Sequence, residues 1–498
     1  MNPPTKLAIP VIVSALTLGV LGDALLRVLP WGANFAIWAS LFATVILFLG
    51  RERRQTFAQG GWWLMLPIAL SPLVFLWRES RPLKALSVLA LLTALSLALL
   101  RAQGGRLRCA SLAKYVLGSL IAGANTVFGM LQLLLENPQW RRPIGDARKS
   151  SALMRGALLS VPPLVIFGAL LLSADAVFLK LFHRIFQFDL TDLLTHLVVI
   201  ALIAVGVGGY LRGLLFRNDL DSAPRELTLP FSLGAIEAGV MLGSLDLLFL
   251  AFVAVQLRYF FGGSALVQAT TGLTYAEYCR RGFFELVAVS ALVLPFLLFA
   301  HWLLRPDDLK GLRLFQWLAG IEILLLFVIM ASAFQRMRLY QAEYGLSEQR
   351  LYPTAFMGWL AVVFVWFCLT VLRGHREQFA FGAMVAGFLL IAALHAVDPD
   401  SLIARTNLAR ASAGHTFDAR YASRLSGDAV PVLISGLSSL NPQDRCELAR
   451  GLLEHWAVPE DPDWRSWTLS RSQARQAVSA NIIALRASCT ETPWRDRK

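Results

Sequence analysis

The sequence is a series of apolar blocks of about 20 residues, separated by short polar or charged connections. Two of these blocks are LAIPVIVSALTLGVLGDALL (7–26) and LVAVSALVLPFLLFAHWLL (286–304). Wound as an α-helix, ~20 residues are ~30 Å long, which matches the hydrocarbon core of a bilayer. The chain is 56% hydrophobic and only 16% charged, whereas charged residues make up ~25% of an average soluble domain. The sequence therefore predicts an all-α fold, a polytopic transmembrane helical bundle.

Eleven blocks are long and apolar enough to be interpreted as membrane-spanning helices. Their predicted limits are 8–29, 31–50, 61–77, 83–100, 154–177, 191–211, 231–256, 282–304, 314–334, 353–372 and 379–397. A twelfth stretch, 112–135, is ambiguous because it carries Lys114, Asn125 and three glycines. Lys6 before the first block also suits a signal peptide, but the apolar run continues past Asp23 without a convincing cleavage site. We therefore expect an uncleaved first span.

The distribution of Lys and Arg decides between eleven and twelve spans, because cytoplasmic loops carry an excess of these residues. With 112–135 in the membrane interface and the N-terminus inside, the cytoplasmic connections hold the excess. With 112–135 as a span, the two sides hold nearly equal numbers. We expect a bundle over 1–397 with eleven spans, a cytoplasmic or interfacial insertion at 101–153, a cytoplasmic N-terminus and an extracytoplasmic region at 398–498.

The region 398–498 contains no block long enough to span a membrane, so it is predicted to be a small, soluble helical domain. One of its helices is expected to begin at Asn441, a capping residue, with Pro442 in the first turn. Cys446 and Cys489 are the only cysteines in this region. In an oxidising compartment they can form a disulfide bond, and the alternative is two unrelated buried thiols.

Acidic side chains inside predicted spans are candidates for function, because each costs several kcal/mol on insertion scales. They are Asp23, Asp175, Glu237, Asp246, Glu285 and Glu322. Arg27 follows Asp23 by four residues, which predicts a structural salt bridge. Asp246 follows small residues on one helix face, where its carboxyl can hydrogen-bond across a close helix contact. Glu322 has no local partner and is the preferred candidate for proton or cation coupling, with a structural role as the alternative.

The segment TYAEYCRRGFFELV (274–287) places polar residues where an apolar block begins. Glu277, Arg281 and Glu285 follow one another at helical i, i+4 steps, so the arginine can bridge both carboxylates. The two tyrosines suit the headgroup layer of a membrane. Two interpretations remain open: a structural anchor at the membrane surface, and a gate or ligand-binding lip at the outer face.

Familiar catalytic and cofactor motifs do not occur in the sequence. It has no His-Glu-x-x-His zinc motif, P-loop, dinucleotide fingerprint or Gly-x-Ser-x-Gly nucleophile elbow. We therefore predict no catalytic residue, no metal and no cofactor. Almost all of the net charge of +13 belongs to the membrane part. There it suits anionic lipid headgroups, and it is not evidence for a nucleic-acid partner.

Several segments resemble an uncharacterised bacterial family known as domain of unknown function 4173. The segments that carry the resemblance are GDALLRVLPWGANFAIW (22–38), SADAVF (173–178), SLGAIEAGVMLGSLDLLFLAFVAVQLRYFFGG (232–263), TYAEYCRRGFFELVAV (274–289), RMRLYQAEYGLSEQRLY (336–352), DPDSLIARTNLAR (398–410) and DWRSWTLSRSQAR (463–475). The resemblance implies a multi-pass protein of the bacterial inner membrane and no particular activity.

In the eleven-span arrangement, several of these segments face the outside together with 398–498. Their polar side chains form a predicted outer-face cluster of Glu277, Arg281, Glu285, Arg336, Arg338, Tyr340, Tyr344 and Arg350. These side chains either lock the loops to the C-terminal domain or bind an anionic headgroup or solute, to which arginine offers bidentate contacts.

Three functions are compatible with these features. The first is a non-enzymatic envelope protein that binds or moves a small or lipidic solute through the bundle. The second is an envelope sensor or scaffold whose C-terminal domain binds a protein partner. The third is a membrane enzyme, for which the sequence supplies no set of catalytic residues.

Overall fold

The computed structural model describes residues 3–50, 64–102, 112–136, 160, 190–216, 232–271, 282–305, 308–457 and 463–489. These residues are almost entirely helical, and the only β-type pairing among them is an isolated bridge between Leu233 and Leu304. Nine of the helices in this part of the chain are long and apolar enough to cross a membrane. The predicted all-α membrane bundle is confirmed.

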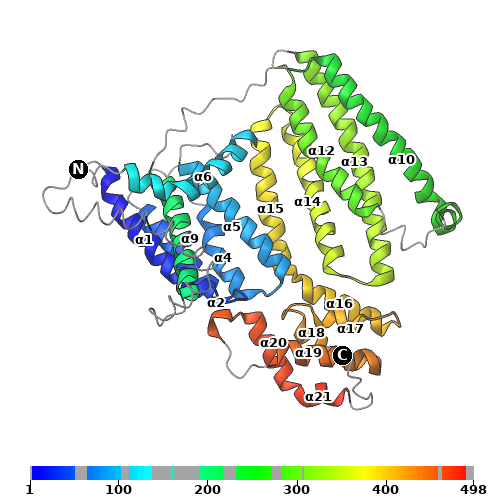
Figure 1. Ribbon diagram of the computed structural model, residues 1–498. Helices are drawn as coiled ribbons and strands as arrows, with labels where there is room; N and C mark the ends of the chain where they lie inside the picture. The colour runs from blue at the N-terminus through cyan, green and yellow to red at the C-terminus, as the bar shows by residue number, and fades with distance from the viewer. Residues whose placement is uncertain are drawn as a thin grey trace, which may run out of the picture.

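An N-terminal set of helices forms one side of the molecule (Figure 1). It consists of α1 (Pro3–Leu26), α2 (Ala33–Gly50), α4 (Met65–Trp77), α5 (Arg81–Ala102), α6 (Leu112–Glu136) and α9 (Leu190–Leu215). α9 packs along both α1 and α6, around buried side chains such as Ile46 and Leu211. Gly19 permits the close approach of α1 and α9, because a Cβ there would lie 2.8 Å from the carbonyl oxygen of Ile200.

A second set of helices forms its own core beside the first (Figure 1). It consists of α10 (Ala235–Thr271), α12 (Phe283–Leu303), α13 (Leu309–Tyr344) and α14 (Glu348–Thr370). α10 runs along α13, and α12 and α14 also pack on α13, around buried rings such as Phe283, Phe315 and Phe364. α15 (Phe379–Val397) lies between the two sets and contacts α14, α5 and α6.

The chain after α15, residues 398–498, is called the tail, and its described helices gather at one end of both sets (Figure 1). They are α16 (Pro399–Ser412), α17 (Ala419–Ser423), α18 (Val430–Ser435), α19 (Pro442–Trp456), the 3-10 turn η8 (Trp464–Ser466), α20 (Leu469–Ala480) and α21 (Ile482–Ala487). The predicted start of α19 is confirmed, because the Asn441 side chain accepts from the Asp444 amide at 2.8 Å. Cys446 and Cys489 are joined by a disulfide bond.

The predicted spans can be compared with the described helices one by one. Block 154–177 lies outside the described residues except for Ser160, and the other ten blocks coincide wholly or partly with helices. Over its described part, block 61–77 is α4, an apolar helix shorter than a span, and α6 is not among the nine long apolar helices. α13 is 36 residues long, well beyond the predicted 314–334. Hydropathy set the predicted limits, whereas Gln, Arg, Met and Leu continue the helix past the apolar part.

The tail meets the turns that end several helices of both sets. The amide of Ala33, at the start of α2, donates to the carbonyl oxygen of Trp467 at 2.9 Å, and Arg465 donates to the carbonyl oxygen of Ala24 at 2.9 Å. The start of α1 lies at the opposite end of the N-terminal set (Figure 1). The sides of the membrane on which these ends lie remain a prediction.

Candidate functional site

Two acidic side chains are buried in the contact between α10 and α13. Glu322 of α13 is 0% exposed and Asp246 of α10 is 8% exposed, and their carboxyl groups are close enough to interact electrostatically. In each helix, buried apolar residues lie one turn before and one turn after the acid. The sequence predicted the two acids as separate candidates, and the structure brings them together as the Asp246–Glu322 pair.

The four carboxyl oxygens of this pair have no hydrogen-bond partner among the described residues. Buried polar groups in proteins are normally paired, and an ionised carboxyl within a membrane costs several kcal/mol. The sequence predicted that Asp246 can form a hydrogen bond across a close helix contact. The described residues supply no such bond, and α13 presents a second acid instead.

Unlike this pair, two of the other acids predicted to lie within spans have polar partners. Glu237 lies in the first turn of α10, where its side chain accepts from a backbone amide at 2.9 Å and faces the positive end of the helix dipole. Asp23 forms the predicted ion pair with Arg27, at 3.8 Å, and also lies 2.5 Å from Nδ1 of His196 on α9. Asp175 lies outside the described residues.

Part of the predicted outer-face cluster holds the turn between α13 and α14. The guanidinium carbon of Arg350 lies 4.3 Å from the ring centroid of Tyr340 and 5.9 Å from that of Tyr344. Its Nη1 also donates to two backbone carbonyl oxygens at the end of α13, at 3.0 and 2.5 Å. Asn407 of the tail binds both the amide and the carbonyl of Leu346 at 2.8 Å. The Arg350 contacts lie within this turn, and the contact with the tail comes from Asn407, which the sequence did not single out. Whether the predicted cluster locks the loops to the tail or binds an anion stays a prediction.

The rest of that cluster is only partly described. Glu277 and Arg281 lie outside the described residues, so the ladder with Glu285 stays a prediction. Glu285 is exposed in the first turn of α12. Arg336 and Arg338 lie in the last three turns of α13, and Arg338 is exposed.

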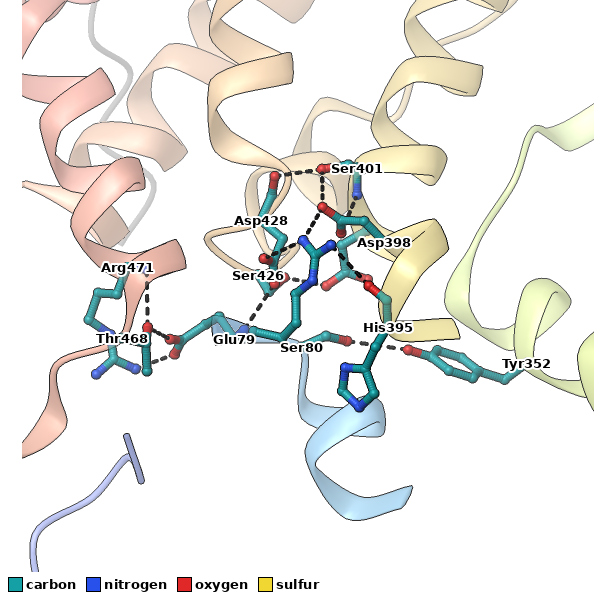
Figure 2. A network of polar contacts seen from close by, with 12 residues as sticks. Glu79, Ser80, Tyr352, His395, Asp398, Ser401, Ser426, Asp428, Thr468 and Arg471 are labelled. Atoms are coloured by element: carbon teal, nitrogen blue, oxygen red, sulfur yellow. Dashed lines mark hydrogen bonds and ion pairs between the residues drawn. The ribbon is translucent and has the colours of Figure 1, made fainter. Parts of the chain in front are cut away.

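A second polar cluster, which the sequence did not predict, joins the tail to the helix sets (Figure 2). Its centre is Arg78, in the turn between α4 and α5. The guanidinium of Arg78 forms ion pairs with Asp398 at 2.5 Å and Asp428 at 3.2 Å, and donates to the carbonyl oxygen of His395 at 3.0 Å. The cluster is called the tail anchor and comprises Arg78, Glu79, Asp398, Asp400, Asp428 and Arg471.

Glu79 extends the tail anchor to α20 (Figure 2). Its amide donates to Asp428 at 2.9 Å, and its carboxylate accepts from the Thr468 hydroxyl at 2.8 Å and forms an ion pair with Arg471. The side chains of Arg78 and Asp428 are only 11% and 3% exposed. The tail anchor is therefore a buried network of opposite charges. The turn between α4 and α5 contributes one part of it, and several segments of the tail contribute the rest.

Asp400 lies inside the tail anchor, in the first turn of α16, and is 1% exposed. The hydroxyl of Ser426 donates to one of its carboxyl oxygens, and the other oxygen has no partner among the described residues. Burial raises the pKa of Asp400 to about 7, the neighbouring carboxylates Glu348 and Asp428 add to this rise, and the hydrogen bond from Ser426 opposes it.

The chain matches the family described as "Domain of unknown function (DUF4153)" over residues 65–436. It belongs to this family. The resemblance to domain of unknown function 4173 was therefore wrong, because the family that matches is a different one. No curated protein and no solved structure matches the chain.

The DUF4153 match extends from α4 into the tail and contains the Asp246–Glu322 pair and most of the tail anchor. Arg471 lies beyond it. The one local signal for the tail anchor was a charged turn between two apolar blocks, WRES at 77–80. Its partners Asp398 and Asp428 lie 320 and 350 positions further along the chain, so no sequence spacing connects them to Arg78.

Proposed function

We propose that this DUF4153 protein binds or moves a small or lipidic solute in the membrane, with the Asp246–Glu322 pair as the coupling site. One observation carries the proposal: two acids face each other in an apolar helix contact and have no partner among the described residues. An acid kept only for structure gains from an opposite charge or a hydrogen-bond donor, as the acids of the tail anchor do. Intramembrane acids in pumps and transporters bind and relay protons or ions.

The proposal includes a location, the bacterial inner membrane, with the N-terminus in the cytoplasm and the tail in the periplasm. Two observations support this orientation. The start of α1 and the tail lie at opposite ends of the helices (Figure 1), and the disulfide between Cys446 and Cys489 suits an oxidising compartment. In intact cells, an impermeant thiol reagent should label these two cysteines only after reduction. Labelling that requires lysis but no reductant would contradict the orientation.

The coupling role is tested with purified protein in proteoliposomes that contain a pH-sensitive dye. Amino acids, sugars, organic anions and short-chain lipids are added outside, one class at a time. We expect one class to change the internal pH with the wild-type protein and not with Glu322→Gln. Glu343→Gln is the matched control, because Glu343 is an exposed glutamate on the same helix. A solute that the wild type and Glu322→Gln move at equal rates would contradict the coupling role.

Exposed apolar side chains favour a second candidate, a scaffold whose tail binds an envelope protein. Ile483 of α21 is 82% exposed and Trp464 of η8 is 60% exposed. Under this alternative, Ile483→Glu abolishes site-specific crosslinking of the tail to its partner, and Glu322→Gln leaves the crosslink intact. Under the transport proposal, solute flux responds to Glu322→Gln and not to Ile483→Glu.

A further inference from the structure

We propose that Asp246 and Glu322 form an intramembrane proton-binding site, in which the two carboxyl groups hold an exchangeable proton as a pair and bind no metal cation. The inference deepens the proposed function and rests on it for its biological role. Proton binding itself can be measured without knowing the solute.

The placement of the two acids shows why they act as a pair. On α10, Asp246 continues the buried stripe of Leu242, Phe249 and Val253, at steps of three and four residues. On α13, Glu322 likewise belongs to a stripe of buried apolar residues that includes Ala319, Leu326, Ile329 and Ala333. Because α10 packs along α13, each acid lies on the face of its helix that meets the other helix.

A bound proton would supply the positive charge and the hydrogen-bond donor that the described residues around the pair lack. Two ionised carboxylates at this position repel each other in an apolar medium, where Coulomb energies are several times larger than in water. The described residues provide no donor to either group. A proton on one carboxyl removes one charge and donates a hydrogen bond to the other, so it relieves the repulsion and the missing hydrogen bond together.

The neighbouring groups fit a proton better than a metal ion. Hard cations such as Mg²⁺ and Ca²⁺ take about six or more oxygen ligands, and the described residues contain no group of three or more His, Cys, Asp or Glu side chains that could hold a metal ion. Ser290 of α12 lies in the same helix set, but its hydroxyl donates to the carbonyl oxygen of Leu286 at 2.8 Å. The charged group that acts on Glu322 among the described residues is Asp246.

Infrared difference spectroscopy between acidic and alkaline pH tests the site, with the full-length protein in lipid nanodiscs. The samples are wild type, Asp246→Asn, Glu322→Gln, the double variant and the control Glu343→Gln. We expect a protonated-carboxyl band at neutral pH in the wild type and the control, and loss of this band in the double variant. We also expect Asp246→Asn to shift the pH midpoint of the band that remains, because Glu322 has lost its charged neighbour.

Two results would overturn the inference. A band that persists unchanged in the double variant belongs to other carboxyl groups, and a band that sodium chloride removes at constant pH indicates a metal-cation site. If the double variant does not fold, isotope labelling of glutamate and of aspartate side chains in the wild type decides. The band must then shift with at least one label, and a band that shifts with neither overturns the inference.

The experiments distinguish a failure of the proton site from a failure of the proposed transport function. A proton-dependent band without solute flux in proteoliposomes supports the proton site and contradicts transport. Solute flux that depends on Glu322 without such a band supports transport and overturns the proton site.

Discussion

The tail anchor and the Asp246–Glu322 pair bury charged side chains in opposite ways. In the tail anchor, Arg78 and Glu79 each lie against opposite charges contributed by the tail. In the pair, two acids interact with each other, and their carboxyl oxygens have no hydrogen-bond partner among the described residues. The first arrangement fixes how two parts of the protein fit together. The second supplies no opposite charge or hydrogen bond to the fold among the described residues, which is why we connect it with function.

The positions of the two clusters agree with this difference. The tail anchor lies where helix turns of the N-terminal set meet the tail (Figure 2). There, directional bonds between guanidinium and carboxylate groups select one way of docking the tail. The pair lies well inside α10 and α13, two helices that meet the length and hydropathy of membrane spans. Substitutions in the tail anchor should therefore lower the free energy of unfolding, whereas substitutions in the pair should not.

The largest effect is expected from Arg78→Met in the tail anchor. This change leaves the buried Asp428 and the half-buried Asp398 without their cation, and loss of one partner from a buried ion pair costs about 3–5 kcal/mol. The free energy of unfolding, measured by chemical denaturation in detergent micelles, should fall by that order. Limited proteolysis should also cut the tail earlier than in the wild type.

Arg420→Met is the matched control for this prediction. Arg420 also lies in an ion pair, with Glu447 at 3.3 Å, but its side chain is 71% exposed. An exposed pair contributes only roughly 0–1 kcal/mol, so this variant should remain close to the wild type. Equal losses in both variants would show that burial does not set the tail anchor apart.

A smaller, pH-dependent effect is expected from Asp400→Asn. Burial raises the pKa of Asp400 to about 7 in the folded protein, whereas an unfolded aspartate has a pKa of ~4. Between these values the folded state binds more protons than the unfolded state, so stability falls as the pH rises. The slope contributed by this one group is at most ~1.4 kcal/mol per pH unit.

Unfolding midpoints of wild type and Asp400→Asn, measured at several pH values between these two pKa values, isolate this contribution. The difference between the two proteins should shift steadily in favour of Asp400→Asn as the pH rises. Glu454→Gln, a change at an exposed position of α19, should run parallel to the wild type. A constant difference between wild type and Asp400→Asn would mean that Asp400 does not couple the tail anchor to pH.

The sequence predicted those features that depend on neighbours along the chain. Apolar blocks marked the helices of both sets, and the Asn441 cap marked the start of α19, because hydropathy and capping act over a few residues. Arg78 and its partners lie hundreds of positions apart, and the sequence carries no spacing that joins them. For the same reason, Asp246 and Glu322 were predicted singly. Their meeting depends on how α10 packs on α13, which hydropathy does not specify.

A modest effect is expected from Tyr344→Leu, in the turn between α13 and α14. Tyr344 is 54% exposed, and its ring lies near the guanidinium of Arg350, which also stacks on Tyr340. A cation–π contact at an exposed site contributes roughly 0.5–1 kcal/mol. The free energy of unfolding should fall by that amount or less. A loss as large as that of Arg78→Met would place this turn with the tail anchor as a second docking point.

The smallest effect on stability, and the sharpest test of the comparison, is expected from Glu322→Gln. The substitution keeps the shape of the side chain and removes a carboxyl group that has no hydrogen-bond partner among the described residues, so the free energy of unfolding should stay unchanged or rise. Asp246→Asn should behave in the same way, because in either variant the amide that replaces one carboxyl can donate a hydrogen bond to the other. Chemical denaturation beside Arg78→Met gives the direct comparison. A loss of several kcal/mol in both variants would mean that the pair stabilises the fold as the tail anchor does, and would remove the reason to connect it with function.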